Sequence, residues 1–369
     1  MNTNKDIKTA NKFAIAKYIY QKKAVTKQDI AYNLNMSLPT VFQNTKELEN
    51  EGIIYQVGQL QSTGGRKATE FSVVEDFRYA IGVDITNNHL TVVLVNFKGE
   101  MVDTQRIRFQ FQNQIESYLE IAKQIENIKE KNNIETKKIL GVGISIAGIV
   151  DIHNNLLYTS HILNIGSLDL QKFSQFIPYP LCFANDANSA AFAETHDHPN
   201  ANLIYIALNY SIGGAIYFNG EIMNGDNFKA GEIGHMTLIP NGKTCYCGKK
   251  GCFDAYCSES SLLKYANDLN EFFELLENKD EKICQIWNEY LEYLAIAINN
   301  LRMIFDCDII LGGTIRNYID PYIIDLSIKL AKYNPFEQLT SYLKLSHCQK
   351  EASAMGVAIM HIDQFFNCF

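Results

Sequence analysis

The chain of 369 residues lacks features that define several protein classes. No apolar segment follows the polar amino terminus, which argues against a secretory signal. The longest apolar run, residues 139–150, has twelve residues and is too short to span a bilayer. Low-complexity segments and long linkers are also absent. We therefore expect a cytoplasmic protein without a membrane partner.

Cysteine is absent before Cys182, and three of the nine cysteines crowd into Cys245, Cys247 and Cys252. In a reducing compartment this clustering favours a metal site over a disulfide framework. Together with His235, these thiols can complete a tetrahedral Cys3His shell, and a shell filled by protein ligands indicates one structural zinc per chain. Cys257 is a weaker candidate because it lies beyond an apparent strand. The alternative is a turn that carries reduced cysteines.

Charge is divided unevenly along the chain. Residues 1–74 hold ten Lys and Arg against six Asp and Glu, a balance of +4, and residues 75–369 carry −12. At 47% hydrophobic residues the chain is long enough to bury sizeable cores, and its length predicts two or three domains. A small basic segment before a large acidic one suggests different partners for the two parts.

The basic segment has the pattern of a helix-turn-helix followed by a hairpin. Apolar spacing predicts an amphipathic helix over 5–20, a short helix capped by Thr26, and a third helix that Ser37 caps and that ends near Gly52. Two apolar stretches, 53–57 and 69–73, then flank a loop with Arg66 and Lys67. This order predicts a winged helix-turn-helix that binds DNA. The alternative is a small helical domain that binds other proteins.

The third helix supplies the candidate base-reading residues. Its inward face is expected to hold Leu38, Val41, Thr45 and Leu48. Thr40, Gln43 and Asn44 then point outward, where polar and amide side chains read base edges in a major groove. Arg66 and Lys67 in the wing can reach phosphates or a minor groove.

Past residue 77 apolar runs alternate with helices, which indicates an α/β fold. The expected strands cover 79–85, 90–96, 101–111, 139–146, 203–208 and 308–311. The expected helices cover 113–131, 190–194, 291–305, which has almost no exposed face, and 352–366. Carboxylates and amides follow these strands at Asn185 and Asp186, and again at Glu232, three positions before His235. Such groups suit a polyhydroxylated ligand, although helix capping explains Asn185 and Asp186 equally well.

These motifs in this order resemble the ROK family, in particular its repressor branch. The resemblance rests on Gly231-Glu232-x-Gly-His235 before Cys245-x-Cys247-Gly-x-x-Gly-Cys252, on Asn185-Asp186-Ala-Asn188, and on Thr63-Gly-Gly-Arg66. It implies a winged helix-turn-helix domain over 1–74 and a two-lobed, actin-like (ribonuclease H-like) sugar-binding body. The first lobe would cover 75–184 plus 351–369, and the second 185–350 with the zinc loop.

The resemblance also implies a set of sugar ligands. They are Asn164, Asn185, Asp186, Glu232, His235 and Asp254, and His235 would bridge zinc and sugar through its two ring nitrogens. Two positions depart from the family pattern, because Asp254 stands where Glu is usual and Ser167 stands where an aromatic residue is usual. Both departures affect the shape of the sugar site.

Family kinases carry glycine-rich phosphate loops that this chain lacks. Residues 84–89 read Asp-Ile-Thr-Asn-Asn-His, and residues 209–211 read Asn-Tyr-Ser, so side chains stand where bare N–H groups must approach phosphate oxygens. Asp186 matches the family's catalytic base, which makes it a vestigial base in a sensor. The alternatives are a ROK-type ATP-dependent sugar kinase fused to a DNA-binding domain, and a zinc-stapled adaptor that binds proteins.

We therefore expect a sugar-responsive repressor of carbohydrate-utilisation genes. A homodimer or homotetramer would bind a palindromic operator and leave it when a monosaccharide or a derivative binds the body. A sugar that tightened operator binding would instead make the protein a co-repressor system.

Overall fold

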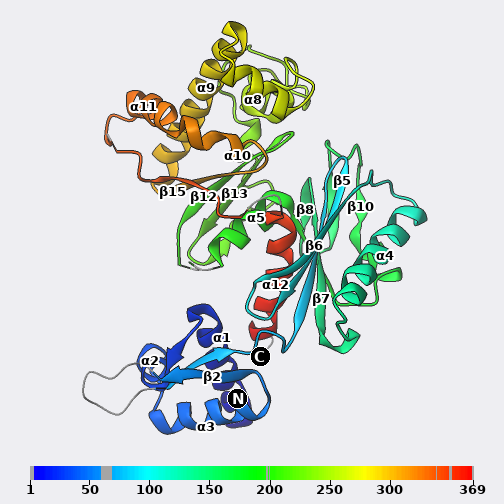
Figure 1. Cartoon of the computed structure of the whole chain (residues 1–369), viewed down its shortest axis with the longest axis vertical. Helices are drawn as coiled ribbons and strands as arrows, with labels where there is room; N and C mark the ends of the chain where they lie inside the picture. Colours follow the sequence, from blue (N-terminus) through cyan, green and yellow to red (C-terminus); the bar gives the residue numbers. More distant parts are fainter. Residues whose placement is uncertain are drawn as a thin grey trace. The chain divides into compact units, whose positions relative to one another are not determined.

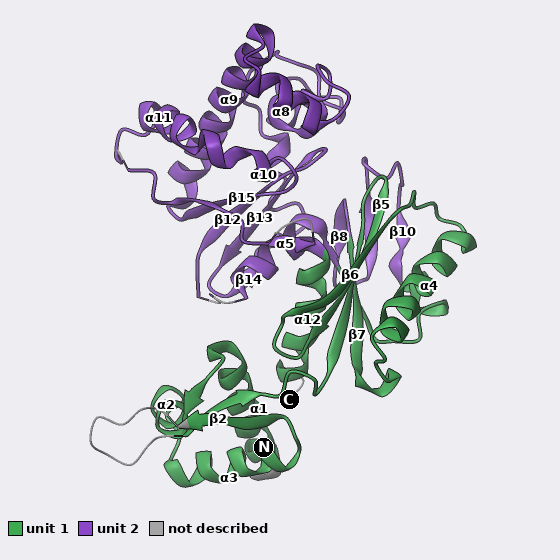
Figure 2. Ribbon diagram, in the orientation of Figure 1, with its two compact units in different colours: residues 1–145, 171–183, 354–369 green, residues 146–170, 184–353 purple. Residues whose placement is uncertain are grey.

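The computed structural model describes residues 4–59, 69–196, 198, 200–337, 339–348 and 351–367. The chain forms two compact units, shown in different colours in Figure 2. Unit 1 comprises Met1–Ser145, Gln171–Phe183 and Ala354–Phe369, and unit 2 comprises Ile146–Leu170 and Ala184–Ser353.

Unit 1 begins with three helices and a small antiparallel sheet, blue in Figure 1. Thr26 caps the second helix through a reciprocal capping box with Asp29, and Ser37 caps the third, as predicted. Asn35, with a φ of 51°, makes the turn between them. The helices are α1 (Asn4–Lys22), α2 (Lys27–Asn33) and α3 (Leu38–Asn50), and the strands, in sheet order, are β1 (Val25–Thr26), β3 (Thr69–Val73) and β2 (Ile54–Gln59).

The buried face of α3 differs from the expected one at two positions. Val41, Thr45 and Leu48 are buried as predicted, but Leu38 is 52% exposed and Asn44 is 2% exposed. Leu38 is the first residue of α3, so it precedes the turns that pack inward. The Asn44 side chain is compatible with burial because its Nδ2 donates to the Thr40 carbonyl at 2.8 Å. The prediction that Leu38 packs inward and Asn44 points outward is therefore wrong.

The rest of unit 1 is mainly a five-stranded sheet with two α-helices, and the last residues of β7 and β11 belong to unit 2. The order of its strands is β11 (Leu181–Asn185), β7 (Ile139–Ile146), β4 (Tyr79–Ile85), β5 (His89–Asn96) and β6 (Met101–Arg108). Helix α4 (Ile115–Lys131) contacts β5 and β6. Helix α12 (Ala352–Asn367) lies so close to the sheet that a Cβ on Gly82 would sit 1.8 Å from the Ala354 carbonyl oxygen. Glycine at that position permits this close packing.

Aromatic rings join α1 to the carboxyl end of α12. Phe13 meets Phe365 with ring centroids 5.8 Å apart, and Tyr20 stacks on Phe366 at 4.8 Å. Lys17 adds a hydrogen bond of 2.7 Å to the side chain of Asn367. We call this cluster the aromatic seam, and its members are Phe13, Tyr20, Phe77, Phe97, Phe365 and Phe366.

Unit 2 contains a small antiparallel sheet and a larger mixed one. The small sheet has the order β10 (Leu168–Asp169), β9 (Leu156–Thr159) and β8 (Ile149–Asp151). The larger sheet has the order β14 (Glu221–Ile222), β13 (Ile212–Phe218), β12 (Leu203–Leu208), β15 (Asp308–Gly312) and β16 (Leu343–Leu345). Strands β12 and β15 pair in parallel, and β12 and β13 pair antiparallel.

The helices of unit 2 show two further differences from the sequence-based expectations. The long helix α9 starts at Glu281 rather than near residue 291, and its Ile304 is 69% exposed, so it does have an exposed face. The segment before Cys257 is helical rather than strand-like. The other helices are α5 (Asp186–Thr195), α6 (Asp254–Cys257), α7 (Glu259–Leu262), α8 (Leu269–Glu277), α10 (Arg316–Ile319) and α11 (Ile323–Tyr333).

Among the described residues, none of the helices combines the length and the apolar character that crossing a bilayer requires.

Candidate ligand cavity and metal cluster

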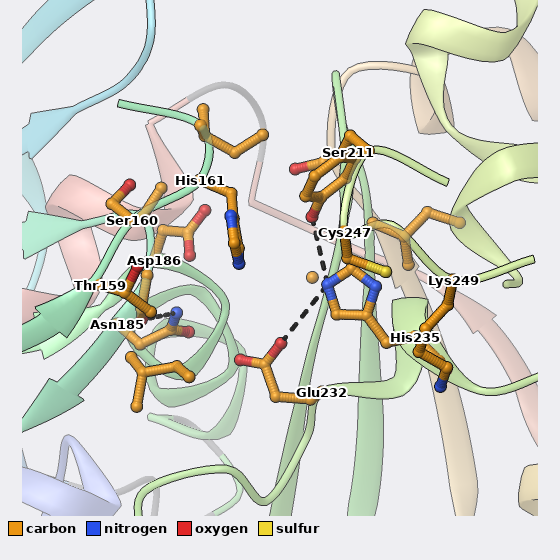
Figure 3. A pocket seen from close by; sticks show the side chains of 17 residues that line it. Thr159, Ser160, His161, Asn185, Asp186, Ser211, Glu232, His235, Cys247 and Lys249 are labelled. Atoms are coloured by element: carbon orange, nitrogen blue, oxygen red, sulfur yellow. Dashed lines mark hydrogen bonds and ion pairs between the residues drawn. The ribbon is translucent and has the colours of Figure 1, made fainter. Parts of the chain in front are cut away.

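Unit 2 contains a cavity of about 250 Å³ whose lining residues all belong to that unit. This volume is below the roughly 300–1,000 Å³ of pockets for drug-sized ligands, which favours a small ligand. Figure 3 shows His161, Asn185 and Asp186 on one side of the cavity, and Glu232 and His235 on the other. Polar groups thus converge on the space from both sides.

Asn185 and Asp186 reach the cavity because β11 ends where α5 begins. Asn185 is the N-cap of α5: its side-chain oxygen accepts the Asn188 N–H at 3.1 Å, and its Nδ2 donates to the Gly148 carbonyl at 2.9 Å. Capping therefore coexists with a place in the cavity wall. Asp186 is the first residue of α5, where the helix dipole favours a carboxylate.

Glu232 and His235 reach the cavity through a tight turn. The short 3-10 helix η3 (Ile233–His235) is entered through Gly231, whose φ of 88° places its backbone against Gly214. Glu232 Oε2 lies 4.0 Å from His235 Nε2. The three-residue spacing therefore does bring both side chains to one site.

The surroundings of these groups shift their protonation. Burial raises the pKa of Asp186 above its ordinary value, and burial together with the nearby Asp186 charge raises the pKa of Glu232. Burial lowers the pKa of His235, and the charges of His161 and Lys249 lower it further. This lowered pKa favours the neutral form of His235, the form in which an imidazole binds metals.

Four side chains beside the cavity form a cluster that could hold a metal ion. One ligand atom from each of His235, Cys245, Cys247 and Cys252 lies within 4.8 Å of all the others. His235 Nδ1 is 3.8 Å from Cys245 Sγ, and Cys247 Sγ is 3.8 Å from Cys252 Sγ. Cys257 is turned away, because its thiol donates to the Tyr290 carbonyl.

The donor set fits a tetrahedral ion. Metal–sulfur bonds of about 2.3 Å place two sulfur ligands about 3.8 Å apart, which matches the distance between Cys247 and Cys252. The loop has few regular elements, and backbone bonds such as Cys245 N–H to the Lys249 carbonyl at 2.8 Å fold it. Gly251 is required there, because a Cβ would sit 1.8 Å from the Ile239 carbonyl oxygen.

Two expected sugar ligands lie outside the cavity lining. Asn164 is exposed, in a turn with a φ of 52°. Asp254 is 2% exposed and accepts the Ile212 N–H at 2.7 Å. Ile212 itself lines the cavity, so Asp254 holds part of the wall.

His161 and Tyr246 are among the lining residues that the sequence-based reasoning missed. His161 follows β9 and belongs to no motif that would have singled it out. Tyr246 stands between two cysteines of the cluster, and its Oη lies 3.3 Å from His235 Nε2. The position of Tyr246 could have been foreseen. His235 belongs to both the cluster and the cavity, so the residues next to the cluster's cysteines must also lie close to the cavity.

The expected DNA-binding residues are placed as follows. Gln43 is exposed on α3, with its Nε2 3.3 Å from Glu47 Oε1. Thr40 is half-buried, and its Oγ1 bonds the capping Ser37 at 2.8 Å. Asn44 is buried and donates to the Thr40 carbonyl at 2.8 Å. Arg66 and Lys67 lie outside the described residues.

Known proteins resemble the chain over most of its length. The xylose repressor of Bacillus spizizenii is 24% identical over 378 residues, covering 98% of this chain and 97% of the repressor. A glucokinase of Halalkalibacterium halodurans is 26% identical over 269 residues, covering 64% of this chain and 80% of the glucokinase.

The crystal structure of a ROK family transcriptional regulator, a homologue of the Escherichia coli MLC protein, matches with a TM-score of 0.79. It is 19% identical and covers 98% of this chain and 97% of that one, which shows a shared fold. The predicted α/β ROK fold is thus confirmed. Because residues 80–364 match the ROK family, this chain belongs to that family.

Proposed function

We propose that this chain is a sugar-responsive transcriptional regulator, a repressor that leaves its operator when a monosaccharide binds unit 2. One observation carries the proposal: a helix-turn-helix with a following hairpin precedes a ROK body whose cavity gathers Asn185, Asp186, Glu232 and His235. The similarity to a xylose repressor along nearly the whole chain supports it, and makes D-xylose the first sugar to test.

The amino-terminal segment is the proposed DNA-binding domain, a winged helix-turn-helix over residues 1–74. The four-residue connection between α2 and α3, the capped α3 and the β2–β3 hairpin support it. Exposed Gln43 is its proposed base-reading residue. Arg66 and Lys67 stay proposed wing contacts to phosphates or to a minor groove. The rest of the chain is the proposed two-lobed, actin-like body.

The proposed sugar ligands are Asn185, Asp186, Glu232 and the Nε2 side of His235. Two acids and an amide around a small cavity suit adjacent hydroxyl groups. His161 and Tyr246 join them as cavity residues, and Asp254 acts by holding Ile212 in the wall.

The proposed metal is one structural zinc per chain, held by His235, Cys245, Cys247 and Cys252. When bound, it fixes the loop and the orientation of the His235 imidazole. Elemental analysis of protein purified without chelators should find about one zinc per chain in wild type and less than half of that in Cys247→Ser. Wild type without zinc would contradict the assignment.

Kinase activity is the second candidate, because Asp186 lies in the cavity and a glucokinase is among the relatives. A hydrogen bond within the chain argues against nucleotide binding. Asn209 Oδ1 accepts the Thr314 N–H at 2.9 Å, so the backbone N–H directly after Gly312-Gly313 already has a partner within the chain. Packing explains Gly312, since a Cβ there would lie 1.9 Å from Tyr205 Oη.

Two assays separate these functions. Selection of duplex DNA from a random library by the full chain should enrich an operator, which the sugar then releases. Coupled-enzyme turnover with ATP and a sugar panel should stay at background. Turnover that Asp186→Asn abolishes would favour the kinase.

Regulation is proposed to act through a homodimer or homotetramer that presents two winged helices to a palindromic operator. Sugar in the cavity favours an arrangement of the chain that binds this operator poorly, and a difference of a few kcal/mol is sufficient.

A further inference from the structure

The exposed side of α3 carries two large apolar side chains. Phe42 is 58% exposed and Leu38 is 52% exposed, one helical turn apart on the same face. We propose that Phe42, flanked by Leu38, contacts the C5-methyl group of thymine in the major groove; this inference rests on the proposed DNA-binding function. Phe42 would then be a specificity-determining residue for an A·T pair in the operator.

The packing of α3 holds Phe42 toward solvent. Val41, Thr45 and Leu48 are fully buried, which fixes the rotation of the helix about its axis. Leu38, Phe42 and Lys46 follow at intervals of four and therefore form one strip beside this buried face. The ring of Phe42 thus reaches solvent from a rigid helix, as base reading requires.

A lysine ammonium rests on this ring. Lys27 Nζ lies 4.1 Å from the centroid of Phe42 and 4.9 Å from that of Phe71. Lys27 is the first residue of α2, the helix that crosses the DNA backbone in helix-turn-helix complexes. The ring and the ammonium together can therefore take a base methyl and a neighbouring phosphate.

The chemistry of the surrounding side chains favours DNA over a protein partner. The core of a protein interface is depleted of charged residues, whereas here an ammonium covers the ring and exposed Lys46 continues the strip. The segment 1–74 carries a balance of +4, complementary to phosphates. The thymine methyl is the apolar group that base pairs present in the major groove. Gln43 beside Phe42 suits the adenine of an A·T pair.

The test uses duplex DNA that the full chain enriches from a random library. Each thymine of this duplex is replaced in turn by deoxyuridine, which lacks the methyl group, and affinities are measured at fixed salt. For wild type we expect one or two positions at which the replacement weakens binding about 3–5-fold, the effect of one buried methyl group. Phe42→Ala should bind more weakly and respond equally to thymine and deoxyuridine there.

Two variants serve as controls. Lys27→Gln should keep the thymine preference and lower the slope of log affinity against log salt by about one. Phe336→Ala, which removes an 82% exposed ring from unit 2, should change neither quantity.

Each outcome has one meaning. Failure to enrich any duplex would overturn the proposed DNA-binding function itself. An enriched duplex whose binding ignores every methyl group, or a Phe42→Ala variant that keeps the wild-type preference, would overturn only this inference. A change in oligomeric state of Phe42→Ala, seen by sedimentation with the methyl preference unaltered, would assign the strip to a protein interface instead.

Discussion

Asp151 is a single residue whose environment keeps its charge in spite of burial. Its side chain is 1% exposed and accepts hydrogen bonds from Asn154 Nδ2 at 2.8 Å, from the His153 N–H at 2.9 Å and from Tyr158 Oη at 2.9 Å. These bonds, that of the Asn154 side chain first, lower its pKa to about 2. The turn between β8 and β9 thus depends on a carboxylate.

Asp151→Asn should therefore lower stability in a pH-dependent way. A carboxyl whose pKa is lowered by folding stabilises the protein above its unfolded pKa, near 4, and this contribution disappears as the pH falls through about 2. The Tm of Asp151→Asn should lie below that of wild type at pH 7, and the gap should narrow from pH 4 downward. Glu221→Gln, at an exposed position, is the control; an equal gap at all pH values would refute the electrostatic reason.

Tyr246 occupies the cavity side of His235, where it would compete with the proposed sugar. Its Oη lies 3.3 Å from Nε2, where a sugar hydroxyl would bind. The ligand for this test is the monosaccharide that most raises the Tm in a screen beginning with D-xylose. Tyr246→Phe should raise the affinity for this sugar about 2–10-fold, because the hydrogen bond between Tyr246 and His235 no longer has to break. Calorimetry measures the change, with Tyr210→Phe outside the cavity as control. Weaker binding would instead mean that the hydroxyl contacts the sugar.

Among the elements, the loop that carries Cys245, Cys247 and Cys252 is expected to depend on the proposed zinc. Between η3 and α6 the structure has only isolated bridges, Thr237 to Cys252 and Thr244 to Lys250. Removing zinc with a chelator should lower the Tm by about 5 °C or more, and adding zinc back should restore it. Cys247→Ser should show the low value without chelator, whereas Cys284→Ser on α9 should respond as wild type does. A chelator without effect would rule out a structural ion.

The aromatic seam is the element-scale contact that holds α1 to α12. Phe366 is 4% exposed and lies against Tyr20 and Phe97. Phe366→Ala should lower the free energy of unfolding by about 3–5 kcal/mol in urea titrations, because the truncation leaves a cavity among rings. Phe336→Ala removes an exposed ring and should cost little. Equal effects of the two variants would show that the seam contributes no packing.

At the scale of the whole molecule, the proposed regulator has to couple two binding sites. If the sugar lowers operator affinity by some factor, the operator must lower sugar affinity by the same factor. Calorimetric titration of sugar into the full chain, with and without the selected duplex, should give that factor. Glu232→Gln should weaken sugar binding and leave the operator affinity measured without sugar unchanged. Independent binding would refute regulation, and tighter binding of both would indicate co-repression.

Local patterns in the sequence predicted much of the fold. Strands β7 and β12 occupy the residues that the apolar runs predicted, and the caps of α2 and α3 lie at Thr26 and Ser37. The cluster of His235 with three cysteines was predicted as well. These features depend on residues close in the chain, where spacing alone restricts the geometry.

Other features needed the tertiary structure. The segments packed against α3 decide which face of this helix is buried. Asn44 is buried, and Leu38 and Phe42 are exposed. The sequence pattern alone predicted the opposite for Leu38 and Asn44. His161 and Tyr246 meet in the cavity from two separate loops. The sequence by itself thus determined many of the elements and the cluster of His235 with three cysteines, because these follow from local spacing, and its motifs indicated the family. The tertiary structure decided which side chains face the cavity and the solvent, because packing between distant segments fixes those directions.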